Sequence, residues 1–317
     1  MSLQMAMFAP DSEWVPPSEF PDLSGAKQIA IDLETRDPDL MKRGPGWPVN
    51  NGEVVGYAVA VDGWCAYYPI GHTGGGNLDR RLVENWMKKV CATDADKVFH
   101  NAQYDVGWLR AHGIEVNGRI IDTMVVASLL DENRRSFSLN SVAYDYLDKV
   151  KSEKDLIAAA REFGLDPKAE MWKLPAMHVG PYAQTDAELT LELWNFFKVK
   201  VGQEGLQEIV DLELALLPCL VDMTSRGVRV DLDAAAKTRD ALIRREKNVV
   251  REIKKLVGNH VEIWAAKSLA DAFDKLSVSY PRTATGAPSF TKAFLTAHEH
   301  PLAKMVVDAR ALNKIQG

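Results

Sequence analysis

The stretch IAIDLETRDP, residues 29–38, joins an apolar run to two acids that flank a leucine. In an extended strand, side chains two positions apart lie on the same face, so Asp32 and Glu34 would stand side by side. Adjacent carboxylates repel each other unless a divalent cation, a shared proton or a basic group neutralises them. The alternative is a solvated strand end followed by a turn, because this spacing of acids is common by chance.

Strand and helix patterns alternate around this stretch. Residues 53–61 and 64–70 are rich in β-branched and aromatic residues, and Asp62-Gly63 between them is a strong hairpin signal. The patterns that follow are helix 78–91, strand 97–100, helix 102–112, strand 118–122 and helix 123–130. Parallel strands need such helical crossovers. The sequence therefore predicts an α/β fold, in which an antiparallel meander extended by parallel strands forms a mixed sheet flanked by helices.

The composition is that of a cytosolic globular protein. Of 317 residues, 46% are hydrophobic and 26% charged, and no run approaches the ~20 apolar residues of a membrane span. Cys65, Cys91 and Cys219 match no metal or redox spacing, and we expect them to be reduced. The net charge of −6 argues against nucleic-acid binding through overall charge but permits a local basic face. We expect residues 1–24 to be a poorly ordered lead-in without a signal peptide.

The second half of the chain changes character. From about residue 203 it reads as two long helices separated by residues 225–231, with Gly227 positioned to end the first helix. The sequence therefore predicts a folded domain over residues 25–202 and a helical second domain over residues 203–317.

Two later acids, Asp105 and Asp186, are also candidates for a functional site. Asp105 lies in the first turns of a predicted helix, with Asn101 as its expected N-cap. Tyr182 and Asp186 are four residues apart, and with Pro181 starting the helix they would share one face. Taken singly, each acid is explained equally well as an ordinary surface residue.

Taken together, D-x-E on a strand, N-x-x-Y-D on a helix and Y-x-x-x-D on a late helix resemble the three exonuclease motifs of the DEDD superfamily. The match is to the tyrosine branch, because the position five residues before the last acid is a proline instead of histidine. The resemblance implies an RNase H-like fold and two divalent cations, Mg²⁺ or Mn²⁺. It implies that Asp32, Glu34 and Asp186 hold the first cation, that Asp32 bridges to the second, and that Asp105 reaches the second mostly through water. Tyr182 would orient the attacking water or help to deprotonate it.

Such a site suits the chemistry of a phosphodiester, because cations ~3.5 to 4 Å apart can bind both the attacking and the leaving oxygen. Hard cations prefer oxygen ligands, so His100 and His112 are expected to pack or face solvent, and Asp122 to cap its helix. Asn101 stays open between a cap and a contact to the terminal nucleotide. Trp47 stays open between base stacking and burial in its loop.

The second half resembles another part of family A DNA polymerases, the DNA polymerase I type. Residues 213–237 are similar to the passage from the exonuclease domain to the thumb, and residues 265–290 and 300–317 to the thumb and its approach to the palm. Counterparts of the palm and fingers are absent, so we expect no DNA synthesis from this chain.

The resemblance implies a proofreading 3′-5′ exodeoxyribonuclease that acts on single-stranded or frayed DNA 3′ ends and releases nucleoside monophosphates. We expect a monomer without membrane contact, in the cytoplasm of a bacterium, as a bacterial or phage protein.

One helix of the second half carries a basic stripe, with Arg244, Lys247, Arg251 and Lys255 at helical spacing. A solvated helix face explains the stripe as well as contact with the backbone of duplex DNA does.

Three rival functions make different predictions. A free-standing exoribonuclease of the RNase D type would discriminate the 2′-OH and lack thumb-like helices. A catalytically silent DNA-binding scaffold would have lost its acids, whereas all four and the tyrosine are present. A metal-free acid/base hydrolase would need a nucleophile or an oxyanion site, and neither is adjacent.

Overall fold

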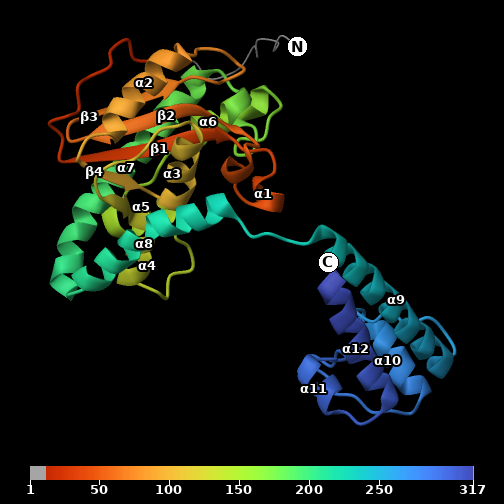
Figure 1. The fold of residues 1–317 in the computed structure, drawn as a ribbon. Helices are drawn as coiled ribbons and strands as arrows, with labels where there is room; N and C mark the ends of the chain where they lie inside the picture. The colour runs from red at the N-terminus through yellow and green to blue at the C-terminus, as the bar shows by residue number, and fades with distance from the viewer. Residues whose placement is uncertain (1–11, 317) are drawn as a thin grey trace. The chain divides into compact units, whose positions relative to one another are not determined.

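The computed structural model describes residues 12–316, and the chain divides into two compact units, one ending at Gly227 and one starting at Val228 (Figure 1). In this described part, no helix is both long enough and apolar enough to cross a membrane. The first unit contains a five-stranded sheet in the order β3-β2-β1-β4-β5. Its strands are β1 Gln28–Arg36, β2 Glu53–Val61, β3 Trp64–Pro69, β4 Asp96–Phe99 and β5 Ile120–Asp122.

The sheet is mixed, as the sequence predicts. β1, β2 and β3 pair antiparallel, and β4 and β5 add to β1 in parallel. Gly63, with a φ of 78°, makes the tight turn between β2 and β3, where a residue without Cβ meets no steric penalty. The pairing of β1 with β4 stops at Ala30 and Val98, and the carboxyl half of β1 continues beyond it. This leaves one edge of β1 open for side chains from elsewhere.

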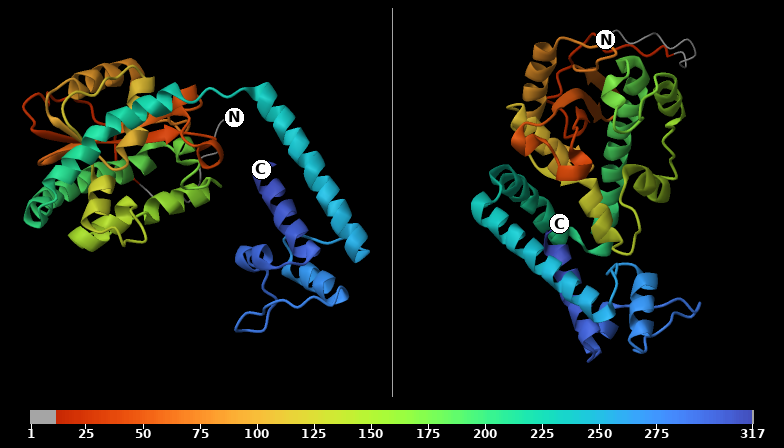
Figure 2. Two further views of the ribbon diagram at one scale, coloured as in Figure 1. Left: turned by 60° about the horizontal axis from the view of Figure 1, so that its bottom comes forward. Right: turned by 90° about the vertical axis from the view of Figure 1, so that its right-hand side faces the viewer.

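Two helices cover opposite faces of this sheet. Tyr67 and Tyr68 follow each other on β3 and point to opposite faces. The Tyr68 ring packs against Trp86 of α2 (Arg80–Cys91), with 4.4 Å between the ring centroids. On the Tyr67 side, Gln184 of α7 (Ala176–Glu204) donates a hydrogen bond of 3.3 Å to the carbonyl of Cys65. The right-hand view of Figure 2 shows the sheet between the orange α2 and the green α7.

The remaining elements of the first unit are short, apart from α8. They are α1 Leu40–Arg43, the 3-10 helix Trp47–Val49, α3 Ala102–Ala111, α4 Thr123–Leu130, α5 Leu139–Leu147, α6 Lys154–Glu162, the 3-10 helix Met171–Lys173 and α8 Gln207–Arg226.

Pro181 does not start a helix, contrary to the sequence-based expectation. α7 begins at Ala176, and Pro181 lies inside it. A proline lacks the N–H that would bond to the carbonyl four residues earlier, which here belongs to Met177. The Ser12 hydroxyl donates to that carbonyl at 2.8 Å, so a contact from outside the helix replaces the missing bond.

The segment before the sheet is packed, and this corrects part of the expected lead-in. Trp14 Nε1 donates to the side-chain oxygen of Gln184 at 2.6 Å, and Phe20 stacks on Tyr68. Leu23 belongs to the core of the first unit. Residues 12–24 are therefore held by aromatic contacts that a pattern search does not detect, while residues 1–11 of the predicted lead-in lie outside the described part.

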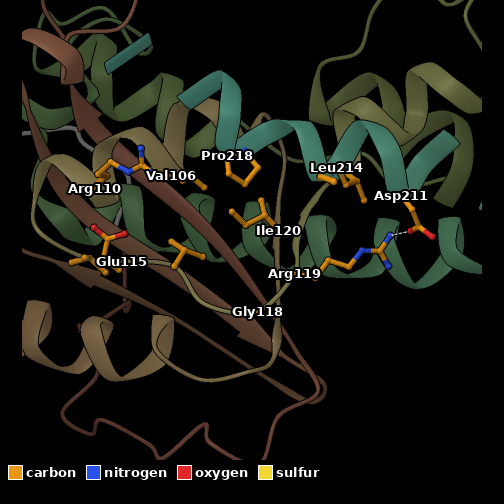
Figure 3. A pocket seen from close by; sticks show the side chains of 12 residues that line it. Val106, Arg110, Glu115, Gly118, Arg119, Ile120, Asp211, Leu214 and Pro218 are labelled. Carbon is orange, nitrogen blue, oxygen red and sulfur yellow. Dashed lines mark hydrogen bonds and ion pairs between the residues drawn. The ribbon is translucent and has the colours of Figure 1, made fainter. Parts of the chain in front are cut away.

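Helix α8 packs on the rest of the first unit, and this compact unit extends to Gly227. Ion pairs join Arg110 of α3 to Asp222, and Arg119 to Asp211. Between these elements lies a small cavity of about 260 Å³ (Figure 3). The side chains that α8 buries recur at helical spacing, at Val210, Leu214, Leu217 and Val221. This apolar face explains why the compact unit ends at Gly227, where α8 stops at a residue with a φ of 63°.

The second unit is helical, as expected. It contains α9 Leu232–Val257, α10 Ala266–Lys275, α11 Lys292–Ala297 and α12 Pro301–Gln316 (Figure 1). Its core includes Ile253 and Val257 of α9 and Leu302 and Val306 of α12.

The basic stripe lies on α9 and points to solvent. Arg244, Lys247, Arg251 and Lys255 are all exposed, and Lys255 pairs with Glu252 at 2.8 Å.

Candidate active site

Asp32 and Glu34 lie on one face of β1, as alternation along a strand requires. Across the ladder Asp32 is opposite Ala58 and Glu34 is opposite Gly56, so small residues leave room beside both carboxylates. Regular pairing shifts between Glu34 and Thr35, which marks a β-bulge directly after the acids. Bulges re-aim the strand and often lie beside functional groups.

The third acid reaches this pair from α7. Asp32, Glu34 and Asp186 each offer a carboxylate oxygen, and these oxygens all lie within 4.8 Å of one another. Glu34 and Asp186 are buried, and Asp32 is half-buried. Tyr182 lies one turn before Asp186 on α7, and both side chains line the same cavity. The structure thus brings together four of the five predicted catalytic residues.

Asp105 lies beside this group but outside the cluster of three. It is buried near the start of α3, and its Oδ1 accepts the backbone N–H of Leu33 at 3.2 Å. That N–H is free to donate because β4 no longer pairs with β1 at this point. Burial raises the pKa of Asp105 well above its ordinary value, and the nearby Asp32 charge adds to the rise.

The three carboxyl groups of the cluster all have raised pKa values, because they are buried close to one another. Burial raises the pKa of Asp32 to about 7, and the Asp186 charge adds to this rise. Burial also raises the pKa of Asp186 to about 6, against the lowering effect of Lys151. The pKa of Glu34 lies well above its ordinary value, again through burial first and the charge of Asp32 second. The cluster therefore favours the binding of a cation, which would stabilise the ionised carboxylates.

The donor atoms fit a hard divalent cation. The three converging groups offer only oxygen, which Mg²⁺ and Mn²⁺ prefer. Oδ1 of Asp186 is buried and has no hydrogen-bond partner among residues 12–316. A buried carboxylate oxygen without a partner is costly, and a bound cation would satisfy it.

Lys151 is a member of this site that the sequence patterns missed. It lies in the loop between α5 and α6, and its ammonium forms an ion pair with Oδ2 of Asp186. The same nitrogen lies 3.1 Å from the centroid of the Tyr182 ring. A lysine between two predicted helices, 35 residues before its partner, leaves no local signal in the sequence.

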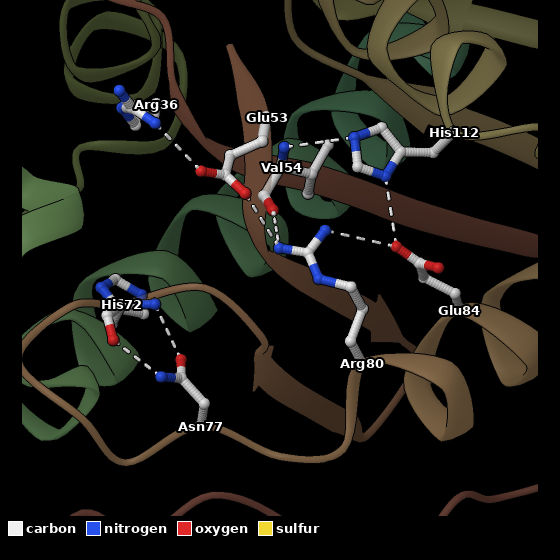
Figure 4. A network of polar contacts seen from close by, with 8 residues as sticks. All are labelled: Arg36, Glu53, Val54, His72, Asn77, Arg80, Glu84 and His112. Carbon is white, nitrogen blue, oxygen red and sulfur yellow. Dashed lines mark hydrogen bonds and ion pairs between the residues drawn. The ribbon is translucent and has the colours of Figure 1, made fainter.

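Tyr67 and His72 form a second group that was missed. The Tyr67 hydroxyl lies where a side chain on Gly56 would project, since an ideal Cβ there would be 2.0 Å from it. The hydroxyl is 2.6 Å from Nε2 of His72. Asn77 fixes the His72 backbone through two hydrogen bonds (Figure 4). Because Gly56 faces Glu34, this buried pair lies beside the Glu34 carboxylate.

Asn101 does not cap α3 with its side chain, which corrects one of its two interpretations. It has a φ of 76°, is exposed, and makes no capping hydrogen bond. The Asp122 carboxylate accepts the N–H groups of Asn101 and Ala102 at 3.0 and 2.8 Å. It also accepts the N–H of Met124, which confirms Asp122 as the cap of its own helix. The predicted contact of Asn101 with a nucleotide remains a prediction.

The other ambiguous residues have structural roles. His100 bridges Thr123 Oγ1 and the Phe137 carbonyl at 2.9 and 2.8 Å. Trp47 is buried with 4% of its surface exposed, so it cannot stack on a base as placed. The network that fixes the start of β2 runs from Arg36 through Glu53, Arg80 and Glu84 to His112 (Figure 4).

Comparison with known proteins places these residues in a family. Residues 20–202 match the sequence profile of a 3′-5′ exonuclease family of the DNA polymerase A type. A DNA-directed DNA polymerase of Pseudomonas phage M6 is 33% identical over 96% of this chain and 47% of its own length. DNA polymerase I of Rhizobium leguminosarum is 26% identical over 91% of this chain and 30% of its own length. The chain thus spans about half the length of the phage relative and less of the bacterial one.

A solved structure has the same fold. It is the POL domain of Pol1 from M. smegmatis in complex with DNA primer-template and dNTP, with a TM-score of 0.68 and 16% identity. The match covers 92% of this chain and 46% of that one.

Proposed function

The chain belongs to the 3′-5′ exonuclease family, and we propose that it hydrolyses the 3′-terminal phosphodiester of DNA with the aid of two divalent cations. The observation that carries this proposal is the convergence of Asp32, Glu34 and Asp186, with carboxylate oxygens within 4.8 Å of one another. Converging oxygen ligands of this kind suit metal-assisted hydrolysis of an anionic ester, which a neutral water attacks slowly.

Asp32, Glu34 and Asp186 would hold one cation, and Asp32 with Asp105 would serve a second. Bound Mg²⁺ or Mn²⁺ supplies Lewis acidity and makes a water nucleophilic at neutral pH. The backbone N–H of Leu33 donates a hydrogen bond to Asp105, so this carboxylate is already oriented before a cation binds.

Tyr182 orients the attacking water in this proposal. Burial and the neighbouring carboxylates raise its pKa above the ordinary range of a phenol, so the hydroxyl of the metal-free site is protonated. A protonated phenol donates a hydrogen bond and cannot take a proton from water. Of the two roles considered for Tyr182, we therefore propose that it positions the water, and Tyr182→Phe tests this role.

The substrate we propose is a single-stranded or frayed DNA 3′ end, released as nucleoside monophosphates. The second unit carries the exposed stripe of Arg244, Lys247, Arg251 and Lys255, which would contact the backbone of the adjoining duplex. A free-standing exoribonuclease of the RNase D type is not expected to have such a helical unit. The curated relatives are named DNA polymerases, which supports proofreading within a longer protein in a bacterial host.

The experiment that tests this function compares 5′-labelled single-stranded DNA with RNA of the same sequence. We expect a one-nucleotide ladder on DNA in Mg²⁺, no ladder in EDTA, and nucleoside monophosphates as the products. A ladder on RNA alone would contradict the proposed substrate and support the RNase D type. Binding of DNA without shortening in any metal would support a silent scaffold.

A further inference from the structure

Lys151 places a positive charge of the chain's own at the side of the carboxylate cluster, in contact with Asp186. Its side chain is only 4% exposed, and that of its partner Asp186 is 9% exposed. Among residues 12–316, this is the only ion pair made by any of the three clustered carboxylates. The Lys151 charge also lowers the pKa of Asp32, which shows that its field reaches beyond the direct partner.

An ordinary buried ion pair would be the simplest explanation of this contact. Such pairs contribute little net stability unless further hydrogen bonds satisfy the remaining lone pairs. Here Oδ1 of Asp186 stays buried without a partner among the described residues, although Oδ2 is paired. The ammonium pairs with one of the three clustered carboxylates, so the cluster stays short of positive charge.

A cavity next to Lys151 gives its side chain somewhere to move. The cavity has a volume of about 420 Å³, and its lining includes Lys151, Glu153, Tyr182 and Asp186. Glu153 is half-buried there and carries a carboxylate that could receive the ammonium. The cavity therefore offers the ammonium a second carboxylate within the same pocket.

We propose that Lys151 is a positioning residue that pairs with Asp186 in the metal-free site and gives up this carboxylate when a divalent cation binds the cluster. Before metal enters, its ammonium holds the Asp186 carboxylate and the Tyr182 ring in place. When metal enters, the ammonium moves into the adjoining cavity beside Glu153. This inference rests on the proposed function, because it requires the cluster to bind metal.

Competition of this kind has a measurable consequence. A ligand whose binding-competent state is only partly populated shows a weaker apparent affinity. Removing the Lys151 charge removes the competitor, and it also leaves three carboxylates with a greater need for a cation. Where the carboxylates are ionised, both effects act in the same direction, so the apparent affinity for metal should rise.

The test is a calorimetric titration of Mn²⁺ into wild-type protein and into Lys151→Met, with melting temperatures measured in EDTA. We expect Lys151→Met to bind Mn²⁺ roughly tenfold more tightly and to melt at a lower temperature without metal. Lys151→Arg keeps the charge and should resemble wild type in both measurements. Lys154→Met removes an exposed charge three residues away and serves as the matched control.

The outcomes separate this inference from the proposed function. If folded Lys151→Met binds Mn²⁺ as weakly as wild type, or more weakly, while wild type binds metal and digests DNA, the Lys151 inference is wrong and the function stands. If wild type binds no Mn²⁺, both are wrong. Should Lys151→Met fail to fold, Lys151→Gln provides the same comparison, because its neutral amide can still donate one hydrogen bond to Asp186.

Discussion

The Tyr67 hydroxyl fills the space that a side chain at Gly56 would need. Gly56 lies on β2, directly opposite Glu34 of β1. The tyrosine is fully buried and its hydroxyl is held by His72, so its ring cannot swing away. The glycine on β2 thus allows a buried phenol to stand beside a carboxylate of the site. The packing of Tyr67 therefore requires glycine at this position.

Gly56→Ala should therefore destabilise the fold and reduce exonuclease activity. The new methyl group would lie 2.0 Å from the Tyr67 hydroxyl and 2.3 Å from its ring. Overpacking of this kind costs about 1 to 3 kcal/mol. Urea unfolding measures the loss relative to wild type, and Gly202→Ala, where an added Cβ meets nothing within 4 Å inside α7, should not lower stability. A Gly56→Ala variant as stable as wild type would show that Tyr67 can move.

The stability of the metal-free protein should fall as pH rises because of the clustered carboxylates. The folded-state pKa of Asp32 is about 7 and that of Asp186 about 6, both above the ordinary value of 3.8. Between these values the folded state binds more protons than the unfolded state, so this contribution is full below 3.8 and is lost as pH rises through 6 and 7.

The measurement is urea unfolding in EDTA at pH 5 and pH 8 for wild type and for Asp32→Asn. The asparagine cannot ionise, so we expect the variant to gain stability relative to wild type as pH rises. A difference that does not change with pH would mean that Asp32 ionises as easily in the folded as in the unfolded chain.

Tyr182→Phe should slow hydrolysis without weakening metal binding. The substitution removes only the hydroxyl, and the three acids stay in place. Misplacing a reacting group costs on the order of a hundredfold in rate, and we expect a decrease of that size when the water is no longer oriented. Single-turnover digestion gives the rate and Mn²⁺ titration gives the affinity. An unchanged rate would exclude Tyr182 from the reaction, and a weaker metal affinity would indicate a structural role.

The basic stripe on α9 should affect binding of duplex DNA more than hydrolysis of single strands. Replacing Arg244, Lys247 and Arg251 by alanine removes three exposed charges from one helix face. Each phosphate that is no longer neutralised should lower the slope of log affinity against log salt by about 0.9. Fluorescence anisotropy of a primer-template duplex at several salt concentrations measures this slope. An unaltered slope would identify the stripe as a solvated surface.

Much of this fold and part of this site follow from local patterns. The β2–β3 hairpin was predictable from Asp62-Gly63, and the shared face of Asp32 and Glu34 from strand alternation. The pairing of these acids with Asp186 required a family resemblance, because no local rule joins residues so far apart in the chain.

The features that were missed depend on interactions between distant segments. Lys151 reaches Asp186 from a loop, and Asp122 caps a helix that starts before it in the sequence. The start of α7 was misplaced because Ser12 supplies the hydrogen bond that Pro181 cannot. Each of these errors concerns a polar group whose partner is set by tertiary structure.

The most direct test of the central claim is digestion of a 5′-labelled single-stranded DNA in Mg²⁺ by wild type and by Asp32→Ala/Glu34→Ala. The account predicts a one-nucleotide ladder that EDTA abolishes and that the double variant, folded by circular dichroism, does not produce. A ladder of equal intensity from the double variant would show that these carboxylates do not carry the reaction.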